Sequence, residues 1–366
     1  MPLVIQDRNF DSDNQFVYPG GGSESAAVQG GGMMGGGMGG GMMGRGMGGG
    51  MMGGRGGGGM GSMMAGMMGV LGDQILVNGI AQASRDVTRR PHRLRLLNAA
   101  NTRTLKLAWS DGSPLTVIGS DGGLLDKPVP RDYVMLAPAE RVELWVDFGR
   151  WQAGGEVALR SLAFDGGIDM GGMRGGMMGG QGALPDGAAF EVQRFKMATG
   201  PAHTGTPPAS LTPIAPPDPR IAVNASLPKV FELTMGMMVW GISGKSFDML
   251  GASELETVKL GTHEVWEFRN EGRNSMMGMV MPHSMHVHGL QFQVLSRAVS
   301  RQFADAYATV SAGFVDEGWK DTVLVMPGER VRVLLHFADY PGLFLYHCHM
   351  LEHEDAGLMR NYLVKA

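Results

Sequence analysis

A short run near the C-terminus, residues 347–353 (HCHMLEH), constrains the fold and chemistry of this chain more than any other feature. The apolar residues 342–346 (GLFLY) lead into it and are typical of a strand. Because side chains alternate between the two faces of a strand, Cys348 should point to one side and His347 and His349 to the other. Cys348 is the only cysteine in the sequence. A thiolate on one face of a strand and two imidazoles on the other predict two metal sites joined through the Cys348 backbone. Thiolate with imidazole suits copper or zinc.

A second histidine motif upstream, His-Ser-Met-His-Val-His-Gly beginning at His283, supplies the missing partners. His286 and His288 stand two residues apart, so in a strand they share a face. His283 can then join Cys348 and His353 in a trigonal set of two imidazoles and one thiolate, which is typical of an electron-transfer copper site. The remaining histidines form a second predicted cluster: His286, His288, His347 and His349.

This pair of motifs resembles the C-terminal domain of the multicopper oxidases, the family of laccases and bacterial cuprous oxidases. The family pattern is H-P-x-H-x-H-G followed by H-C-H-x-x-x-H. Here the second motif is intact, whereas the proline of the first stands before the first histidine, at Pro282. The resemblance, nearest to the copper-efflux oxidases of Gram-negative bacteria, extends to three further segments: residues 93–98 (RLRLLN), 120–125 (SDGGLL) and 318–323 (GWKDTV).

The resemblance implies a role for each motif residue. The matches are His283, Cys348 and His353 for the type 1 copper, His286 for the type 2 copper, and His288, His347 and His349 for the type 3 coppers. In the family, electrons from the substrate enter at type 1 copper, and dioxygen is reduced to water at the other three. Glu354 matches a carboxylate that relays protons to that cluster, with a solvated surface acid as the alternative.

Two positions near the first copper depart from the efflux oxidases. Leu358 stands where those enzymes carry an axial methionine, and loss of a weak axial ligand should favour Cu(I) and raise the reduction potential. A one-residue shift would instead bring Met359 to the metal. Met281 matches a methionine that binds substrate Cu(I), and the alternative is that it only packs over the site. Three further methionines crowd the same segment: Met276, Met277 and Met279.

The largest departure is that half of the histidines of a family trinuclear cluster are missing. The family uses eight, four of them from an N-terminal domain, and the other histidines of this chain are isolated in sequence: His92, His203, His263 and His336. We expect these four to be ordinary structural or surface residues. The chain is therefore interpreted as the second and third cupredoxin domains of an oxidase, with the N-terminal domain lost by truncation or carried on a separate chain. A stand-alone type 1 copper protein is the third explanation.

Short alternating apolar segments separated by turn residues predict an all-β chain, and 366 residues favour two domains. With the resemblance, the expectation is two cupredoxin-like Greek-key β-sandwich or barrel domains. The predicted division is a middle domain at 1–200, a proline-rich linker at 201–220 and a C-terminal domain with the copper sites at 221–366.

A low-complexity tract of glycine and methionine interrupts the first domain at about residues 20–69, with a smaller one at 170–178. So much glycine is costly to order, and few branched apolar residues are available to offset that cost, which predicts a disordered insertion. Thioether sulfur suits Cu(I), so the tract is interpreted as a collector of cuprous ions. The alternative is a glycine-rich expansion that carries methionine with it.

These observations predict a copper-dependent oxidase that takes electrons from Cu(I) or phenols and passes them to dioxygen. The alternative is a non-enzymatic protein that binds, carries or sequesters copper. A net charge of −4 gives no reason to expect a nucleic-acid partner, and no apolar run is long enough for a membrane span. The first residues do not read as a signal peptide, so a periplasmic location is implied by the resemblance alone.

Overall fold

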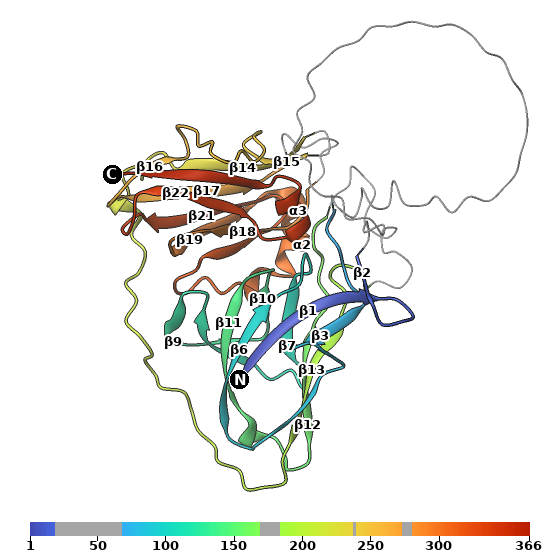
Figure 1. Ribbon diagram of the computed structural model, residues 1–366. Helices are drawn as coiled ribbons and strands as arrows, with labels where there is room; N and C mark the ends of the chain where they lie inside the picture. Colours follow the sequence, from blue (N-terminus) through green and yellow to red (C-terminus); the bar gives the residue numbers. More distant parts are fainter. Residues whose placement is uncertain (19–67, 169–183, 237–238, 273–279) are drawn as a thin grey trace, which may run out of the picture.

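The structure is a computed structural model that describes residues 1–18, 68–168, 184–236, 239–272 and 280–366. Nearly all regular elements in these ranges are β-strands, so the prediction of an all-β chain is confirmed (Figure 1). The glycine-methionine insertion predicted at 20–69 lies outside the described residues except for its last two positions, and so does the smaller tract at 170–178.

The N-terminal part of the chain builds two sheets that enclose one core. The larger sheet contains β1 (Pro2–Phe10), β2 (Phe16–Val17), β3 (Gln74–Val77), β4 (Ile80–Ala81), β6 (Pro91–Asn98), β8 (Leu115–Ser120), β9 (Gly123–Arg131) and β11 (Arg141–Asp147). The smaller contains β5 (Ser84–Val87), β7 (Leu105–Trp109), β10 (Val134–Leu136), β12 (Glu156–Ser161) and β13 (Phe190–Met197). Alternation explains the core: along β11, Val142, Leu144 and Val146 are buried between less buried neighbours.

The C-terminal part repeats this plan with two five-stranded sheets. One has the order β15 (Val239–Ile242), β14 (Lys229–Gly236), β17 (His263–Asn270), β21 (Glu329–His336), β19 (Phe292–Val299). The other has the order β16 (Thr257–Lys259), β23 (Met359–Lys365), β22 (Gly342–Cys348), β18 (His283–Val287), β20 (Thr322–Val325). Within the described residues, two short α-helices complete it, α2 (Ala304–Ala308) and α3 (Leu351–Asp355). Both histidine motifs fall on the second sheet or directly after it.

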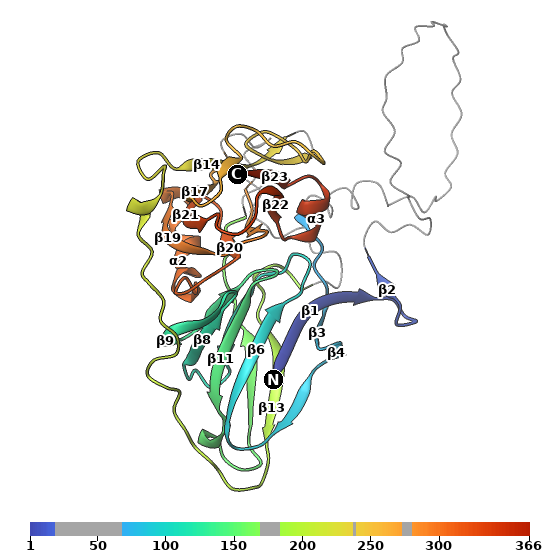
Figure 2. The same ribbon diagram turned by 60° about the vertical axis from the view of Figure 1, so that its left-hand side comes forward.

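Residues 198–228, between the two pairs of sheets, contain no strand. This supports the proposed division into a first domain (1–200) and a second domain (221–366). The proline-rich segment 201–220 runs along the outside of the molecule from the first domain to the second (Figures 1 and 2). It is held to the first domain, because the amide of Leu211 donates to the carbonyl of Asp126 over 2.8 Å.

The second domain rests on one end of the first, and β20, the edge strand of the sheet that carries both histidine motifs, lies next to the first domain (Figure 2). Strand β20 is buried along its whole length, which a strand with one solvated face would not be. Its Leu324 packs in a small apolar cluster with Met135 and Ala137 of the first domain. The contact therefore packs β20, the neighbour of the histidine-bearing strand β18, against the first domain.

Candidate metal centres

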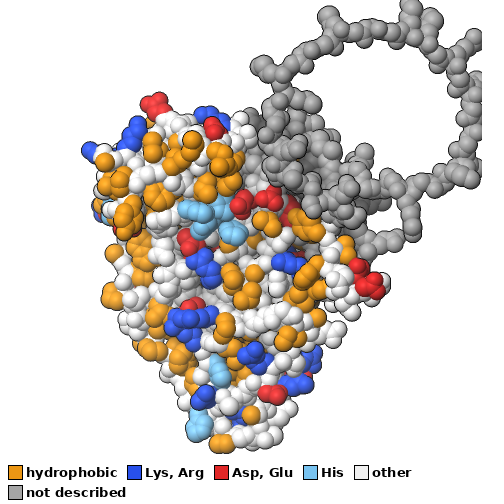
Figure 3. All heavy atoms as spheres, viewed as in Figure 1, with side chains coloured by type: hydrophobic (Ala, Val, Ile, Leu, Met, Phe, Trp, Pro, Cys, Tyr) orange, Lys and Arg blue, Asp and Glu red, His pale blue; other side chains and the backbone are white. Residues whose placement is uncertain are grey.

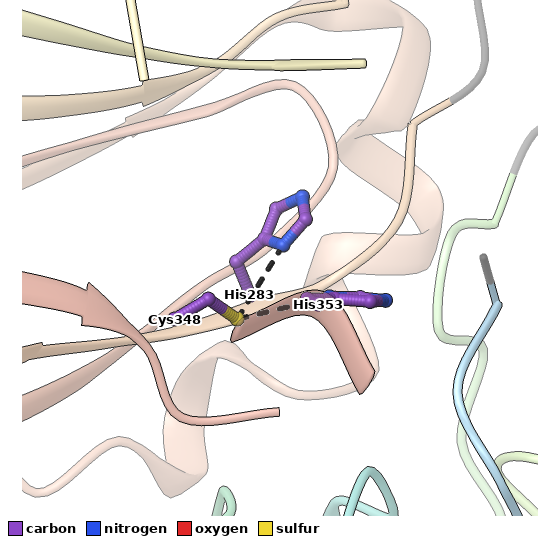
Figure 4. Close-up of side chains that lie close together, drawn as sticks. All are labelled: His283, Cys348 and His353. Atoms are coloured by element: carbon purple, nitrogen blue, oxygen red, sulfur yellow. Dashed lines mark hydrogen bonds between the residues drawn. The ribbon is translucent and has the colours of Figure 1, made fainter. Parts of the chain in front are cut away.

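The cysteine centre lies where β18 begins and β22 ends. The Cys348 Sγ atom is 3.7 Å from Nδ1 of His283 and 3.7 Å from Nδ1 of His353, which α3 carries (Figure 4). All three side chains are buried, at 0–1 % exposure. The structure thus brings together the three residues of the predicted trigonal set, with their donor atoms turned toward one another.

The electrostatics of this centre favour a bound cation. Burial raises the pKa of the Cys348 thiol to about 12, against weaker lowering by backbone hydrogen bonds. Burial, reinforced by His353, lowers the pKa of His283 well below its usual value. A buried thiol and two imidazoles around one point offer lone pairs, and a metal ion compensates the thiolate charge that burial otherwise disfavours. Thiolate with two histidines is a donor set that fits copper.

Two apolar side chains enclose the cysteine centre. The Trp240 ring lies 5.0 Å from the His283 ring and 4.6 Å from the His353 ring, between centroids. Leu358 is fully buried in the same core cluster as Cys348. Strand register places Met359 opposite His347, so Met359 belongs to the other face of the sheet. The geometry therefore puts leucine, not methionine, on the cysteine side.

The second cluster lies on the opposite face of the same two strands. Pairing of β18 with β22 sets His286 beside His347 and Met285 beside Cys348, so the two faces alternate as the spacing of the motifs indicates. Donor atoms of His286, His288 and His347 all lie within 4.8 Å of one another. The His349 ring is 5.4 Å from that of His347, measured between centroids. Figure 3 shows histidine side chains gathered at the surface where the two domains meet.

Hydrogen bonds set which nitrogen each histidine presents. His286 Nδ1 is 2.9 Å from the carbonyl oxygen of Asp321, an acceptor only, so Nδ1 carries the proton and Nε2 is left for a metal. His347 Nδ1 is likewise engaged, at 3.1 Å from the Cys348 carbonyl and 3.2 Å from the Glu354 carboxylate. The Nε2 atoms of His288 and His347 then face each other at 3.0 Å. Two such nitrogens fit a shared cation, so this face also suits copper.

Sequence reasoning missed an ion network that fixes this cluster from the first domain. Arg141 donates to both carboxylate oxygens of Asp321, at 2.7 and 2.6 Å. The adjacent Lys320 is buried between Asp121 and Glu140, at 3.0 and 3.1 Å. Burial alone would raise the pKa of Asp321, but the hydrogen bonds from Arg141 and His286 lower it well below its usual value. The charged form is thus held beside His286.

A second missed residue is Glu352 in α3, which directly precedes His353. Its buried carboxylate accepts hydrogen bonds from Thr102 Oγ1 (2.6 Å), Asn101 Nδ2 (2.9 Å) and the Tyr18 hydroxyl (2.8 Å), all in the first domain. The Ser284 hydroxyl, where the family pattern has proline, also crosses the interface and donates to the Pro138 carbonyl over 2.7 Å. No sequence spacing signals either contact.

The other predicted site residues are placed as follows. Glu354 is half-buried, and although burial raises its pKa, the hydrogen bond with His347 lowers it below the usual value. Met281 is 2 % exposed and packs in the core cluster that contains Cys348, with its carbonyl held by Asn270. The three crowded methionines lie outside the described residues: Met276, Met277 and Met279. His263 and His336, which are isolated in sequence, lie side by side in the structure, with ring centroids 3.8 Å apart.

Comparison with known proteins agrees with this geometry. The sequence profile of the family described as "Multicopper oxidase" matches residues 222–366. A laccase of Bacillus stratosphericus is 31 % identical over 303 residues, which cover 79 % of this chain and 54 % of the laccase. A bilirubin oxidase of Albifimbria verrucaria is 32 % identical over 297 residues, covering 79 % of this chain and 47 % of that enzyme. The chain therefore spans about half the length of these curated relatives.

Solved structures give the same result for the fold. The crystal structure of the McoA multicopper oxidase of Aquifex aeolicus aligns with a TM-score of 0.69 at 29 % identity, over 100 % of this chain and 66 % of that one. Residues 222–366 belong to the multicopper oxidase family, and the sandwiches of the chain are cupredoxin-like, as predicted. Copper is the cofactor that the family name states, and both donor sets fit it. No helix in the described residues is long and apolar enough to cross a membrane.

Proposed function

We propose that this chain is the electron-accepting half of a copper-dependent oxidase that takes electrons from Cu(I) or phenolic donors and delivers them to dioxygen. The observation that carries the proposal is the back-to-back arrangement on β18 and β22. Cys348 and two histidines meet on one face, and His286, His288 and His347 meet on the other. Copper bound at the two faces would supply one-electron transfer and dioxygen reduction.

The residues of the chain itself set up this chemistry. Cys348 is joined by peptide bonds to His347 and His349, so the two ligand sets share a continuous covalent path. Trp240 and Leu358 keep water from the cysteine side. Glu354 lies 3.2 Å from Nδ1 of His347 and is half-exposed, so it can exchange protons between solvent and the histidine face.

We propose that an upstream cupredoxin domain completes the histidine face. On the histidine face of this chain, three histidines are only partly buried: His286, His288 and His349. A family trinuclear cluster needs four further histidines, and the chain spans about half of its curated relatives. The domain would belong to the same polypeptide or to a separate one. By the same resemblance, we propose a periplasmic location.

We propose Cu(I) as one substrate, collected by the methionine-rich tract. The described residues on both sides of the tract contact the second domain. The Tyr18 hydroxyl bonds to Glu352 of α3, next to His353, and Met68 packs against the core cluster that includes Cys348. Ile168, just before the smaller tract, packs against the same cluster. Thioether ligands suit Cu(I), so the attachment points support delivery to the cysteine centre.

The second candidate function is a protein that binds or carries copper without reducing dioxygen. The incomplete histidine face favours it, since four histidines are half of a family cluster. Both candidates share the cysteine centre. Cys348→Ser should abolish blue absorption and electron transfer while the fold, followed by circular dichroism, is kept. A variant that stays blue would contradict the assignment of the centre.

The test that separates the two candidates is dioxygen uptake by the copper-loaded chain, with Cu(I) or a dimethoxyphenol as donor and bound copper quantified. We expect one blue copper and no uptake alone, and uptake once an upstream cupredoxin domain from a family member is added. No uptake with a domain that demonstrably binds would favour the copper carrier. Uptake by the chain alone, with about four coppers bound, would overturn the need for an upstream domain.

A further inference from the structure

Two histidines far apart in sequence meet on the outer face of the second domain. Strands β17 and β21 pair antiparallel along their whole length, and the register sets His263 directly opposite His336. Directly opposite side chains in such a pair share a face. The two imidazole rings stack with centroids 3.8 Å apart and planes 6° from parallel. Both side chains are partly exposed.

This face is separate from the metal centres already described. Val265 and Leu334 share it and pack in a small apolar cluster of their own. Trp266, on the opposite face of β17, packs in the core cluster that contains Cys348. The pair also lies in the sheet β15-β14-β17-β21-β19, whereas the cysteine and histidine motifs lie in the other sheet. An ion held by the pair would not compete for their ligands.

The ring nitrogens of the pair are free to bind. Within the described residues, no hydrogen bond joins a ring nitrogen of either histidine to another group, whereas the His92 ring is bonded to Thr88 at 3.2 Å. Burial and the neighbouring His336 lower the pKa of His263, so its imidazole is neutral at neutral pH. Neutral imidazole is the form that binds metal ions.

We propose that His263 and His336 form a two-histidine site for a divalent copper ion on the outer face of β17 and β21. Imidazole and water in a tetragonal arrangement suit Cu(II), which also binds nitrogen sites more tightly than other first-row divalent ions. The rings now face each other, so binding requires rotation about the side-chain torsions until one nitrogen of each ring points at the ion. Strand pairing already supplies the proximity. The site goes beyond the proposed oxidase function and does not depend on it.

The experiment is a Cu(II) titration of the copper-loaded chain at neutral pH, with bound copper counted and the electron paramagnetic resonance spectrum recorded. The chain is compared with His263→Ala, His336→Ala, their double variant and the control His203→Ala, which removes an exposed histidine of the first domain. Losing one imidazole should weaken one equivalent of Cu(II) by about 100-fold, because two linked groups then no longer bind the ion together.

The expected pattern is loss of the same single equivalent in both single variants, no further loss in the double variant, and unchanged binding in the control. The blue absorption of the cysteine centre should be intact in all of them, which shows that each variant is folded. His336→Gln, which keeps a polar side chain of similar size, replaces any variant that is not. Binding in His263→Ala or His336→Ala equal to that of the parent chain would mean that the rings only stack, and would overturn the proposal.

Discussion

The hydrogen bond between Thr102 and Glu352 offers a sharp test of how the two domains are joined. Thr102→Val keeps the shape of the side chain and removes only the hydroxyl that donates to Glu352 over 2.6 Å. The acceptor is a buried carboxylate, and a hydrogen bond to a charged group contributes about 1.5–3 kcal/mol. We therefore expect Thr102→Val to lower the free energy of unfolding by about 2 kcal/mol.

The same segment contains a matched control. Thr104 is also buried, but its hydroxyl has no hydrogen-bond partner within the described residues. Thr104→Val removes a polar group that gains nothing from burial, so it should leave stability unchanged or raise it. Both substitutions are isosteric and lie in one short segment, so the difference between them isolates the bond to Glu352.

A double-mutant cycle with Glu352→Gln assigns the effect to the pair. The assay is urea unfolding of the copper-free chain, followed by tryptophan fluorescence and circular dichroism, so that bound copper does not contribute. Residues in direct contact should show a coupling of about 1 kcal/mol or more, whereas independent sites add within about 0.5 kcal/mol. Additive effects of Thr102→Val and Glu352→Gln, or an equal cost for Thr104→Val, would refute the reasoning.

Three further predictions concern other parts of the chain. Leu358→Met should cost less than about 1.5 kcal/mol, as a volume-conserving exchange, and should lower the reduction potential of the cysteine centre in a redox titration; an unchanged potential would mean that the added sulfur does not reach the metal. Burial raises the pKa of Glu256, but the hydrogen bonds from Arg360 outweigh it and lower the pKa from 4.5 to about 2. A carboxyl group with a depressed pKa stabilises the fold at pH values above its ordinary pKa, and this contribution is lost as the pH falls. Between pH 4.5 and about 2 the free energy of unfolding of the parent chain should therefore fall by about 3 kcal/mol more than that of Glu256→Gln. An equal fall for both proteins, measured by urea unfolding at each pH, would contradict it. Arg103→Met should cost about 3–5 kcal/mol, because it leaves the buried Asp7 carboxylate, now 2.7 Å away, without its cation; a thermal unfolding midpoint equal to that of the parent would contradict it.

The parts of the site that sequence predicted are those set by strand alternation and motif spacing. Cys348 and His347 are neighbours in one strand, so their opposite directions follow from the period of two. The same parity decides between Leu358 and Met359, but only once the register of β22 and β23 is known. Sequence spacing left that register open by one residue, and one residue exchanges the two faces.

The parts that sequence did not predict depend on which strands become neighbours. The sequence alone does not bring His263 and His336 together, because nothing in either segment specifies that β17 pairs with β21. Asp321 lies in segment 318–323, and nothing in that segment indicates its partner Arg141, which lies on a strand of the other domain. Such contacts arise from tertiary packing across long sequence separations. Periodicity indicates which face a residue takes but not what that face meets.

The buried Lys320 has a consequence for how this chain can be inherited. Its ammonium group belongs to the second domain, yet both acids beside it, Asp121 and Glu140, belong to the first. A recombination event that replaced residues 1–200 with a domain lacking these acids would leave the buried ammonium group of Lys320 without a counter-charge. This would lower the free energy of unfolding by about 3–5 kcal/mol. Exchange of the first domain between related proteins is therefore tolerated only when the incoming domain carries both acids that pair with the lysine. The two domains are expected to evolve as one piece of sequence, even though each has a core of its own.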